Sequence, residues 1–279
     1  MRDIFVIGGI CADISVRPMA AALGRDSNPS RIGLGVGGVG FNIACRLAEL
    51  GRGVRMTAAV GSDGFYPLIK AAAERAGVTL LPACAGRSGV YVCVEGADGD
   101  MDVAYSDLED TERNITPELI GPLLGEINSC AACVLDGNLT AGAIEFAARN
   151  ISVPIIADPV STKKALRFLP VMDRLFAFKP NIYEARAITG LETPADCARA
   201  IVDMGCGAAF VSCGAEGICW ADKTGFGFEK AAPVAGATKG AGDAACAMLV
   251  NVLLSGGTAA EAAREANRFA AERIKSNLQ

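Results

Sequence analysis

The chain of 279 residues contains no histidine. This absence excludes a Ser-His-Asp triad, a Cys-His protease and a zinc site with histidine ligands, because each of them needs an imidazole. A general base in this protein has to be a carboxylate or another less common group. The search for catalytic residues therefore concentrates on aspartate and glutamate.

Basic runs and long apolar runs are also missing. With 26 Lys+Arg against 31 Asp+Glu, the formal net charge is −5, so we expect no nucleic-acid partner. The most apolar late stretch, 244–254, follows Asp243 and contains Asn251, which predicts a buried helix instead of a membrane span. The apolar run Ile4–Ile7 is too short for a signal peptide. We expect a cytoplasmic protein with no membrane partner.

The 11 cysteines are odd in number and scattered through apolar segments. This usage is typical of free thiols in a reducing compartment. Cys130 and Cys133 form a single CxxC motif with no second pair and no histidine. We interpret them as structural thiols in preference to a redox or metal site.

Short apolar runs of β type alternate with alanine-rich segments of helical period. This pattern is typical of an α/β fold with a mostly parallel sheet flanked by helices. Strands are expected at residues 4–8, 55–60, 132–135, 154–157, 175–178 and 208–212. Helix starts are indicated by Thr-Pro at 116–117 and 193–194, and by the capping box of Thr258 and Glu261. No linker or repeat is visible, so a single domain over residues 1–279 is expected.

Two segments interrupt this alternation. Residues 11–35 are polar and contain proline, and residues 88–106 predict two strands around the turn Asp98-Gly99. Such strands cannot belong to the parallel sheet. We therefore expect a small β lid over the carboxyl edge of the large sheet, where open α/β folds bind ligands.

The first glycine cluster, residues 33–40 (GLGVGGVG), satisfies GxGxxG twice and precedes a helical stretch at 41–50. A dinucleotide-dependent oxidoreductase would need a core strand directly before these glycines. Residues 27–31 (SNPSR) do not form one. The alternatives are a flexible loop, or a loop that brings the backbone close to a small polyol, with Asn42 hydrogen-bonding the polyol from the first helical turn.

The second cluster consists of Gly240, Ala241, Gly242 and Asp243, at the start of the apolar helix. Small residues there leave backbone N–H groups unpaired, and the helix dipole adds positive potential. This predicts an anion site for a phosphoryl group in transfer. Asp243 would accept the proton of the attacking hydroxyl. The alternative is an ordinary helix-terminal acid that contributes under about 1 kcal/mol.

Further polar residues follow predicted strands. Asn181 and Glu184 are three residues apart, so they share a helical face that can turn oxygen groups toward hydrated Mg²⁺ and phosphate. Asp136 and Asp158 follow other strands and lie along the same edge. Lys164 supplies positive charge for a triphosphate, with solvated surface as the alternative.

The stretch from Ser212 to Gly217 contains a glycine turn between runs of β type. Such a turn allows the backbone to approach a planar ligand. The Walker-A spacing GxxxxGK[ST] is absent, which disfavours a P-loop NTPase.

These motifs together resemble the ribokinase-like carbohydrate kinase superfamily over essentially the whole chain. Residues 37–44 (GGVGFNIA) resemble its N-terminal signature, and residues 240–244 (GAGDA) its C-terminal one. Asn181 and Glu184 resemble its NxxE motif, and Asp13 its sugar-binding aspartate. The resemblance implies an ATP-dependent kinase with a central parallel sheet, a β lid, ATP and Mg²⁺ as cofactors, and a homodimeric assembly.

Within the superfamily the chain is most similar to pseudouridine kinases, on the basis of residues 26–29, 103–107, 158–161 and 175–184. This implies phosphorylation of the 5′-hydroxyl of pseudouridine. Ribokinase or another nucleoside or sugar kinase is the alternative acceptor class. A less favoured alternative is a kinase-like fold that serves as a non-catalytic ligand sensor.

The resemblance also implies residue roles. Asp243 is expected as the base, with Gly240, Ala241 and Gly242 as the anion hole. The substrate-binding residues are expected to be Asp13, Asn28, Gly38, Asn42 and Asp107. The ATP-binding residues are expected to be Lys164, Asn181, Ser212, Gly214, Gly217 and Asn267. Asn181 and Glu184 are expected to organise Mg²⁺ through water.

One departure from the family pattern precedes the second glycine cluster. The family usually has a threonine just before the first glycine, and often an aspartate upstream, in a segment that binds a monovalent cation. Here residues 237–239 are Ala, Thr and Lys. A family-type K⁺ site is therefore not expected. The hypothesis is that Lys239 supplies the missing charge, with a lysine that simply points to solvent as the alternative.

Overall fold

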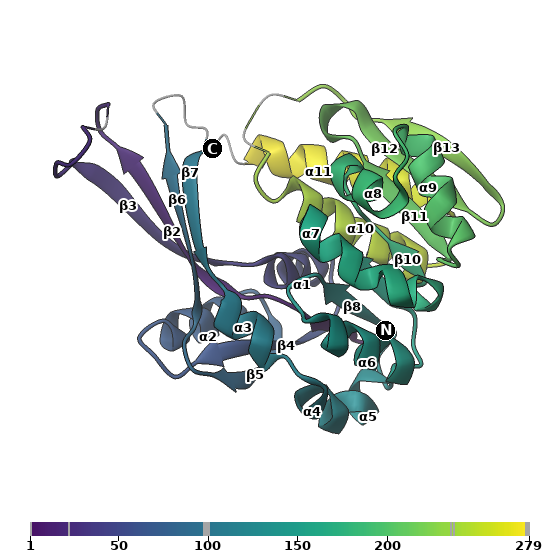
Figure 1. Cartoon of the computed structure of the whole chain (residues 1–279), viewed down its shortest axis with the longest axis horizontal. Coiled ribbons are helices and arrows are strands. Elements are labelled where there is room, and N and C mark those ends of the chain that lie inside the picture. Colours follow the sequence, from purple (N-terminus) through teal and green to yellow (C-terminus); the bar gives the residue numbers. More distant parts are fainter. Residues whose placement is uncertain (1, 22, 97–100, 235, 237, 277–279) are drawn as a thin grey trace.

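The computed structural model describes residues 2–21, 23–96, 101–234, 236 and 238–276. Its centre is a large sheet, which has nine strands among the described residues (Figure 1). In sheet order they are β13 (Gly225–Lys230), β12 (Gly217–Asp222), β11 (Ala208–Ser212), β10 (Ala177–Phe178), β9 (Ile155–Asp158), β8 (Ala132–Asp136), β1 (Ile4–Ile7), β4 (Val54–Gly61) and β5 (Val78–Ala85). The strands from β11 to β5 are parallel, and β12 and β13 are added antiparallel. The expected mostly parallel sheet is confirmed.

Helices cover both faces of the large sheet. One face carries α1 (Val39–Glu49), α2 (Tyr66–Arg75), α10 (Ala241–Leu254) and α11 (Ala259–Ser276). The other carries α3 (Glu109–Asn114), α4 (Pro117–Ile120), α5 (Leu124–Ile127), α6 (Ala141–Asn150), α8 (Ile182–Thr189) and α9 (Pro194–Asp203), with α7 (Thr162–Ala165) and the 3₁₀ segments η1 (Gly121–Leu123) and η2 (Leu166–Arg174). A third 3₁₀ segment, η3 (Gly214–Glu216), joins β11 to β12. Every residue of β1, β8 and β9 is buried, as expected for parallel strands covered on both sides.

The predicted helix starts are present. The Thr193 side chain accepts a hydrogen bond from the Asp196 N–H, and Thr258 and Glu261 cap each other reciprocally. α4 begins at Pro117, after Thr116, although the Thr116 side chain makes no capping bond. Residues 244–254 form the buried part of α10 and its last turn. Among the described residues, no helix combines the length and apolar character that crossing a bilayer requires.

A second, small sheet projects from the large one at the carboxyl ends of its parallel strands (Figure 1). Its strands, in order, are β3 (Ser30–Gly37), β2 (Cys11–Pro18), β6 (Gly89–Glu95) and β7 (Met101–Asp107). β6 and β7 form the expected antiparallel pair, while the predicted turn Asp98-Gly99 lies outside the described residues. One expectation is wrong: Gly33–Gly37 is not a loop but pairs with β2 as the edge strand β3.

Candidate active site

The carboxyl ends of the parallel strands bring charged side chains to one edge. Asp136 ends β8 and Asp158 ends β9, directly opposite each other in the register. Lys179 follows β10, and its ammonium lies 3.0 Å from Asp158 Oδ2, with both side chains buried. Burial acts to lower the pKa of Lys179, but the Asp158 carboxylate, together with Cys246 and Glu184, raises that pKa overall. The edge therefore holds a buried ion pair beneath the start of α10.

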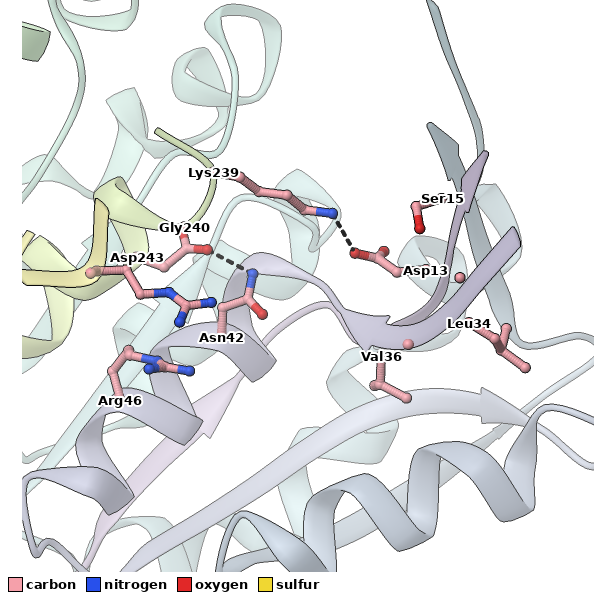
Figure 2. A pocket seen from close by; sticks show the side chains of 12 residues that line it. Asp13, Ser15, Leu34, Val36, Asn42, Arg46, Lys239, Gly240 and Asp243 are labelled. Carbon is pink, nitrogen blue, oxygen red and sulfur yellow. Dashed lines mark hydrogen bonds and ion pairs between the residues drawn. The ribbon is translucent and has the colours of Figure 1, made fainter. Parts of the chain in front are cut away.

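Asp243 lies on the first turn of α10, after Gly240, which caps the helix in the left-handed conformation at φ 77°. Its Oδ2 accepts a hydrogen bond of 2.7 Å from Asn42 Nδ2 on α1 (Figure 2). Burial, followed by the nearby Asp158 carboxylate, raises the pKa of Asp243 to about 7, although Asn42 and Lys179 oppose the shift. A carboxylate that titrates near neutral pH suits a general base.

A cavity of about 460 Å³, the Asp243 cavity, opens in front of this carboxylate (Figure 2). It lies between the small sheet and the starts of α1 and α10. Its lining residues are Asp13, Ser15, Gly33, Leu34, Gly35, Val36, Asn42, Arg46, Lys239, Gly240, Asp243 and Arg273. Its volume is within the range of sites for small molecules. Two of the predicted substrate-binding residues, Asp13 and Asn42, face each other across it.

A second cavity of about 490 Å³, the Asn267 cavity, lies on the other side of the same helix start. Four predicted ATP-binding residues line it: Ser212, Gly214, Gly217 and Asn267. Most of the remaining wall is apolar, from side chains such as Ile218, Val234 and Ile274. A Cβ at Gly217 would lie 2.1 Å from the Glu229 carbonyl oxygen, so only glycine fits there.

The turn from Gly240 to Asp243 separates the two cavities. Gly240 and Asp243 line the Asp243 cavity, whereas Ala241 and Gly242 line the Asn267 cavity. The Ala241 N–H donates to the Thr238 carbonyl at 3.1 Å, so this predicted anion-hole donor is already engaged. Gly242 and Asp243 are the first-turn residues whose N–H groups precede the first i→i−4 bond of the helix, which Ala244 makes to Gly240.

Lys164, predicted to bind ATP, lines neither of the two cavities. Its ammonium pairs with the Glu112 carboxylate on α3 and lies 2.6 Å from Asn138 Oδ1. It does not line the Asn267 cavity. The Lys164 ammonium is therefore held in an ion pair with Glu112.

Asn28 and Asp107 also lie outside the Asp243 cavity. The Asn28 side chain closes the turn between β2 and β3, accepting from the Leu23 N–H at 2.7 Å and donating to its carbonyl at 3.0 Å. Asp107, at the end of β7, pairs with Arg87 at 3.3 Å. Both side chains interact with residues that are no more than 20 positions away in the sequence.

Gly38 has a backbone role. It caps α1 at φ 106°, and a Cβ there would lie 2.5 Å from the Gly9 carbonyl oxygen. The missing side chain lets α1 approach the end of β1, which positions Asn42. Gly38 itself does not line the Asp243 cavity.

Asn181 and Glu184 are bonded to each other. Asn181 Oδ1 accepts from the Glu184 N–H at 2.9 Å, and Glu184 Oε2 accepts from the Asn181 N–H at 2.7 Å, which is a capping box at the start of α8. Burial raises the pKa of Glu184. In the described part of the chain, no group of three acidic or cysteine side chains could hold a metal ion. A magnesium ion here would depend mainly on phosphate and water ligands.

The Lys239 side chain lines the Asp243 cavity. Its ammonium lies 3.2 Å from Asp13 Oδ2, across the mouth of the Asp243 cavity (Figure 2). The alternative that it simply points to solvent is therefore wrong, although its side chain is largely exposed. Its charge is directed at the aspartate of the small sheet.

Several residues of the site were not among the predicted site residues. Asp136 Oδ2 accepts from the N–H groups of Gly9 at 2.8 Å and Gly40 at 2.7 Å, so it fixes the start of α1. The sequence signal for Asp136 was its position at the end of a predicted strand, and the same signal applied to Lys179. Arg273 had no signal, because its place depends on how α11 packs against α10.

A helix start that carries one acid, between a cavity lined by charged side chains and a largely apolar one, is an arrangement suited to phosphoryl transfer. The model of the pfkB family of carbohydrate kinases matches residues 1–278. The chain belongs to this family and is an ATP-dependent kinase.

Known relatives agree with this assignment. The pseudouridine kinase of Escherichia coli is 28% identical over 273 residues, covering 94% of this chain and 87% of the relative. The structure of a carbohydrate kinase from Agrobacterium tumefaciens matches with a TM-score of 0.89 and 25% identity, covering 99% and 91%. Ribokinase from Arabidopsis thaliana, complexed with ribose and ATP, matches with a TM-score of 0.83 and 19% identity, covering 98% and 93%. The ribokinase-like fold expected from the sequence is confirmed.

Proposed function

We propose that the protein transfers the γ-phosphoryl group of ATP to the 5′-hydroxyl of pseudouridine. The observation that carries the transfer is the position of Asp243 on the turn that separates the two cavities. The acceptor would occupy the Asp243 cavity and the adenine the Asn267 cavity. The choice of pseudouridine is supported by the 28% identity to the Escherichia coli pseudouridine kinase.

Asp243 acts as the general base in this proposal. The hydroxyl of the acceptor donates its proton to the Asp243 carboxylate as its oxygen bonds to the γ-phosphorus. The bond from this phosphorus to the bridging oxygen breaks, and its electron pair leaves on ADP. Asn42, which holds Asp243 Oδ2 at 2.7 Å, orients the base. Asp13 accepts hydrogen bonds from ribose hydroxyls.

The developing charge needs electrophilic support. The N–H groups of Gly242 and Asp243 and the dipole of α10 supply part of it. Mg²⁺ bound to the triphosphate would neutralise further charge. Asn181 and Glu184 contact its water shell in this proposal, with the capping box setting their orientation.

We further infer a homodimer that uses the small sheet. Cross-strand partners place apolar side chains in two adjacent rows on one face of this sheet. The rows consist of Ile32, Val16, Val94 and Val103, and of Leu34, Ile14, Val92 and Tyr105. Ile32 and Tyr105 are more than 60% exposed. An apolar face of this kind marks an interaction surface, and a second copy offers the same face for a symmetric contact.

The acceptor is tested by an ADP-release screen of the purified protein. The panel contains pseudouridine, uridine, other nucleosides, ribose and common sugars, each with MgATP. We expect pseudouridine to give the highest kcat/KM. A higher value with ribose or another sugar would replace pseudouridine as the acceptor and leave the kinase assignment in place.

A further inference from the structure

Arg273, on the last turns of α11, lines the Asp243 cavity together with Gly240 and Asp243. A Cβ placed on Gly240 would lie 3.8 Å from Arg273 Nε. The guanidinium is therefore beside the residue that opens the helix-start anion site. Arg273 lies 30 residues beyond Asp243 in the sequence, on a helix that also contributes Asn267, Ala270, Ala271 and Ile274 to the Asn267 cavity.

The other cations around this turn have carboxylate partners. Lys179 Nζ would lie 3.8 Å from a Cβ on Gly242, but it pairs with Asp158 at 3.0 Å. Lys239 pairs with Asp13 and Arg46 pairs with Glu49. Among the described residues, no carboxylate forms an ion pair with Arg273, whose guanidinium bonds to the Ser276 hydroxyl at 3.3 Å. The positive charge of Arg273 thus enters the cavity without a counter-charge from the described part of the protein.

Two physical explanations compete for this arginine. A cation near the end of a helix interacts favourably with the helix dipole, and Arg273 is in the last turns of α11. That effect requires only a position near the helix end, and Lys275 provides it equally. It does not require a position beside Gly240, at the start of a different helix. Phosphate recognition accounts for both the position and the missing counter-charge.

We propose that Arg273 is a phosphate-binding residue of the active site that contacts the phosphoryl group in transfer. The guanidinium donates hydrogen bonds to non-bridging oxygens of the γ-phosphate and keeps its own proton throughout. The acceptor oxygen bonds to phosphorus, the bridging bond to ADP breaks with its electron pair, and the proton goes to Asp243. The inference rests on the proposed position of the phosphoryl group at the Gly240–Gly242 turn, and not on which alcohol accepts it.

Nucleotide binding tests the proposal without any acceptor. Calorimetry compares MgAMP-PNP, which carries a γ-phosphate, with AMP, which does not. Arg273→Gln is expected to weaken MgAMP-PNP binding roughly tenfold, the scale of a charged hydrogen bond, and to leave AMP binding unchanged. Arg273→Lys keeps the charge without the fork of donors and should give an intermediate loss. The matched control is Arg268→Gln, which removes an exposed arginine of the same helix that pairs with Glu265.

Turnover with the best acceptor from the ADP-release screen gives the second readout. Arg273→Gln should lower kcat roughly a hundredfold, as expected when a donor to a transition-state charge is lost. The acceptor KM should change much less. Wild-type affinity of Arg273→Gln for MgAMP-PNP, or an equal loss of affinity for AMP, would overturn the proposal. A failure of pseudouridine in the screen, with the AMP-PNP effect intact, would remove the proposed acceptor and retain Arg273.

Discussion

The strongest residue-level expectation concerns Asp243 as the base. In Asp243→Asn the amide cannot accept the hydroxyl proton, so we expect turnover to fall by roughly 10² or more, the usual contribution of general-base catalysis. The fold and the binding of MgAMP-PNP should persist, since the side chains are of similar size. Steady-state ADP release and calorimetry measure the two quantities. Turnover close to that of the wild type would refute this role.

The pKa of Asp243 predicts two opposite pH effects. Because burial raises the pKa of Asp243 from its ordinary value of 3.8 to about 7, kcat/KM should rise with pH through a midpoint near 7 and level off above it. Between these two pH values the folded state retains a proton that the unfolded chain releases, so stability falls as pH increases. Asp243→Asn removes this cost and should raise the melting temperature relative to the wild type at pH 8, but not at pH 4. An equal difference at both pH values would contradict the burial of a titrating carboxylate.

Sequence motifs identified the site residues that lie next to a glycine cluster at a helix start. Asp243 and Asn42 follow glycine clusters, and the structure joins them across 201 positions of sequence. Lys164 and Asp107 lie outside the two cavities and pair with Glu112 and Arg87, which belong to no motif, so the sequence did not reveal these ion pairs. Arg273 could not have been found, since no local pattern encodes the packing of α11 on α10.

At the level of elements, β9 and β10 are joined at their ends by the buried pair of Asp158 and Lys179. Lys179→Met leaves the Asp158 charge buried without its partner. The free energy of unfolding should fall by about 3–5 kcal/mol, as measured by urea denaturation.

Two further variants isolate this effect. The double variant Asp158→Asn with Lys179→Met should regain most of the loss, because no unpaired charge remains. Lys70→Met breaks the exposed pair with Glu74 and should change stability by less than about 1 kcal/mol. A Lys179→Met protein as stable as the Lys70→Met control would show that the pair carries no such energy.

The six predicted strands are present within a few residues of their expected bounds, because each is a short apolar run. β5 was not predicted: it is an edge strand with Pro82 in its middle and partly exposed side chains, and proline is tolerated at such an edge. β3 was taken for a loop because its glycines conceal the alternation of Ile32, Leu34 and Val36. Pairing with β2, a tertiary interaction, decides its conformation.

At the scale of the whole molecule, the sequence predicted the sheet class and a small β layer, since both follow from the order of the elements. It did not indicate how the small sheet is held at the active site. The contact between Asp13 and Lys239 joins that sheet to the start of α10 across the Asp243 cavity. Two segments more than 200 positions apart form this contact, so no local pattern could reveal it.

The apolar face of the small sheet predicts the assembly state. Tyr105 is an exposed member of one of its two apolar rows and is paired with Val92. Tyr105→Glu places a charge in the proposed contact, where desolvation without a partner is costly. We expect light scattering to give the mass of two chains for the wild type and of one chain for Tyr105→Glu. The matched control is Ser106→Glu, which adds the same charge to the adjacent residue, whose side chain points to the opposite face. A wild-type mass of one chain, or dissociation in both variants, would show that this face does not hold two copies together.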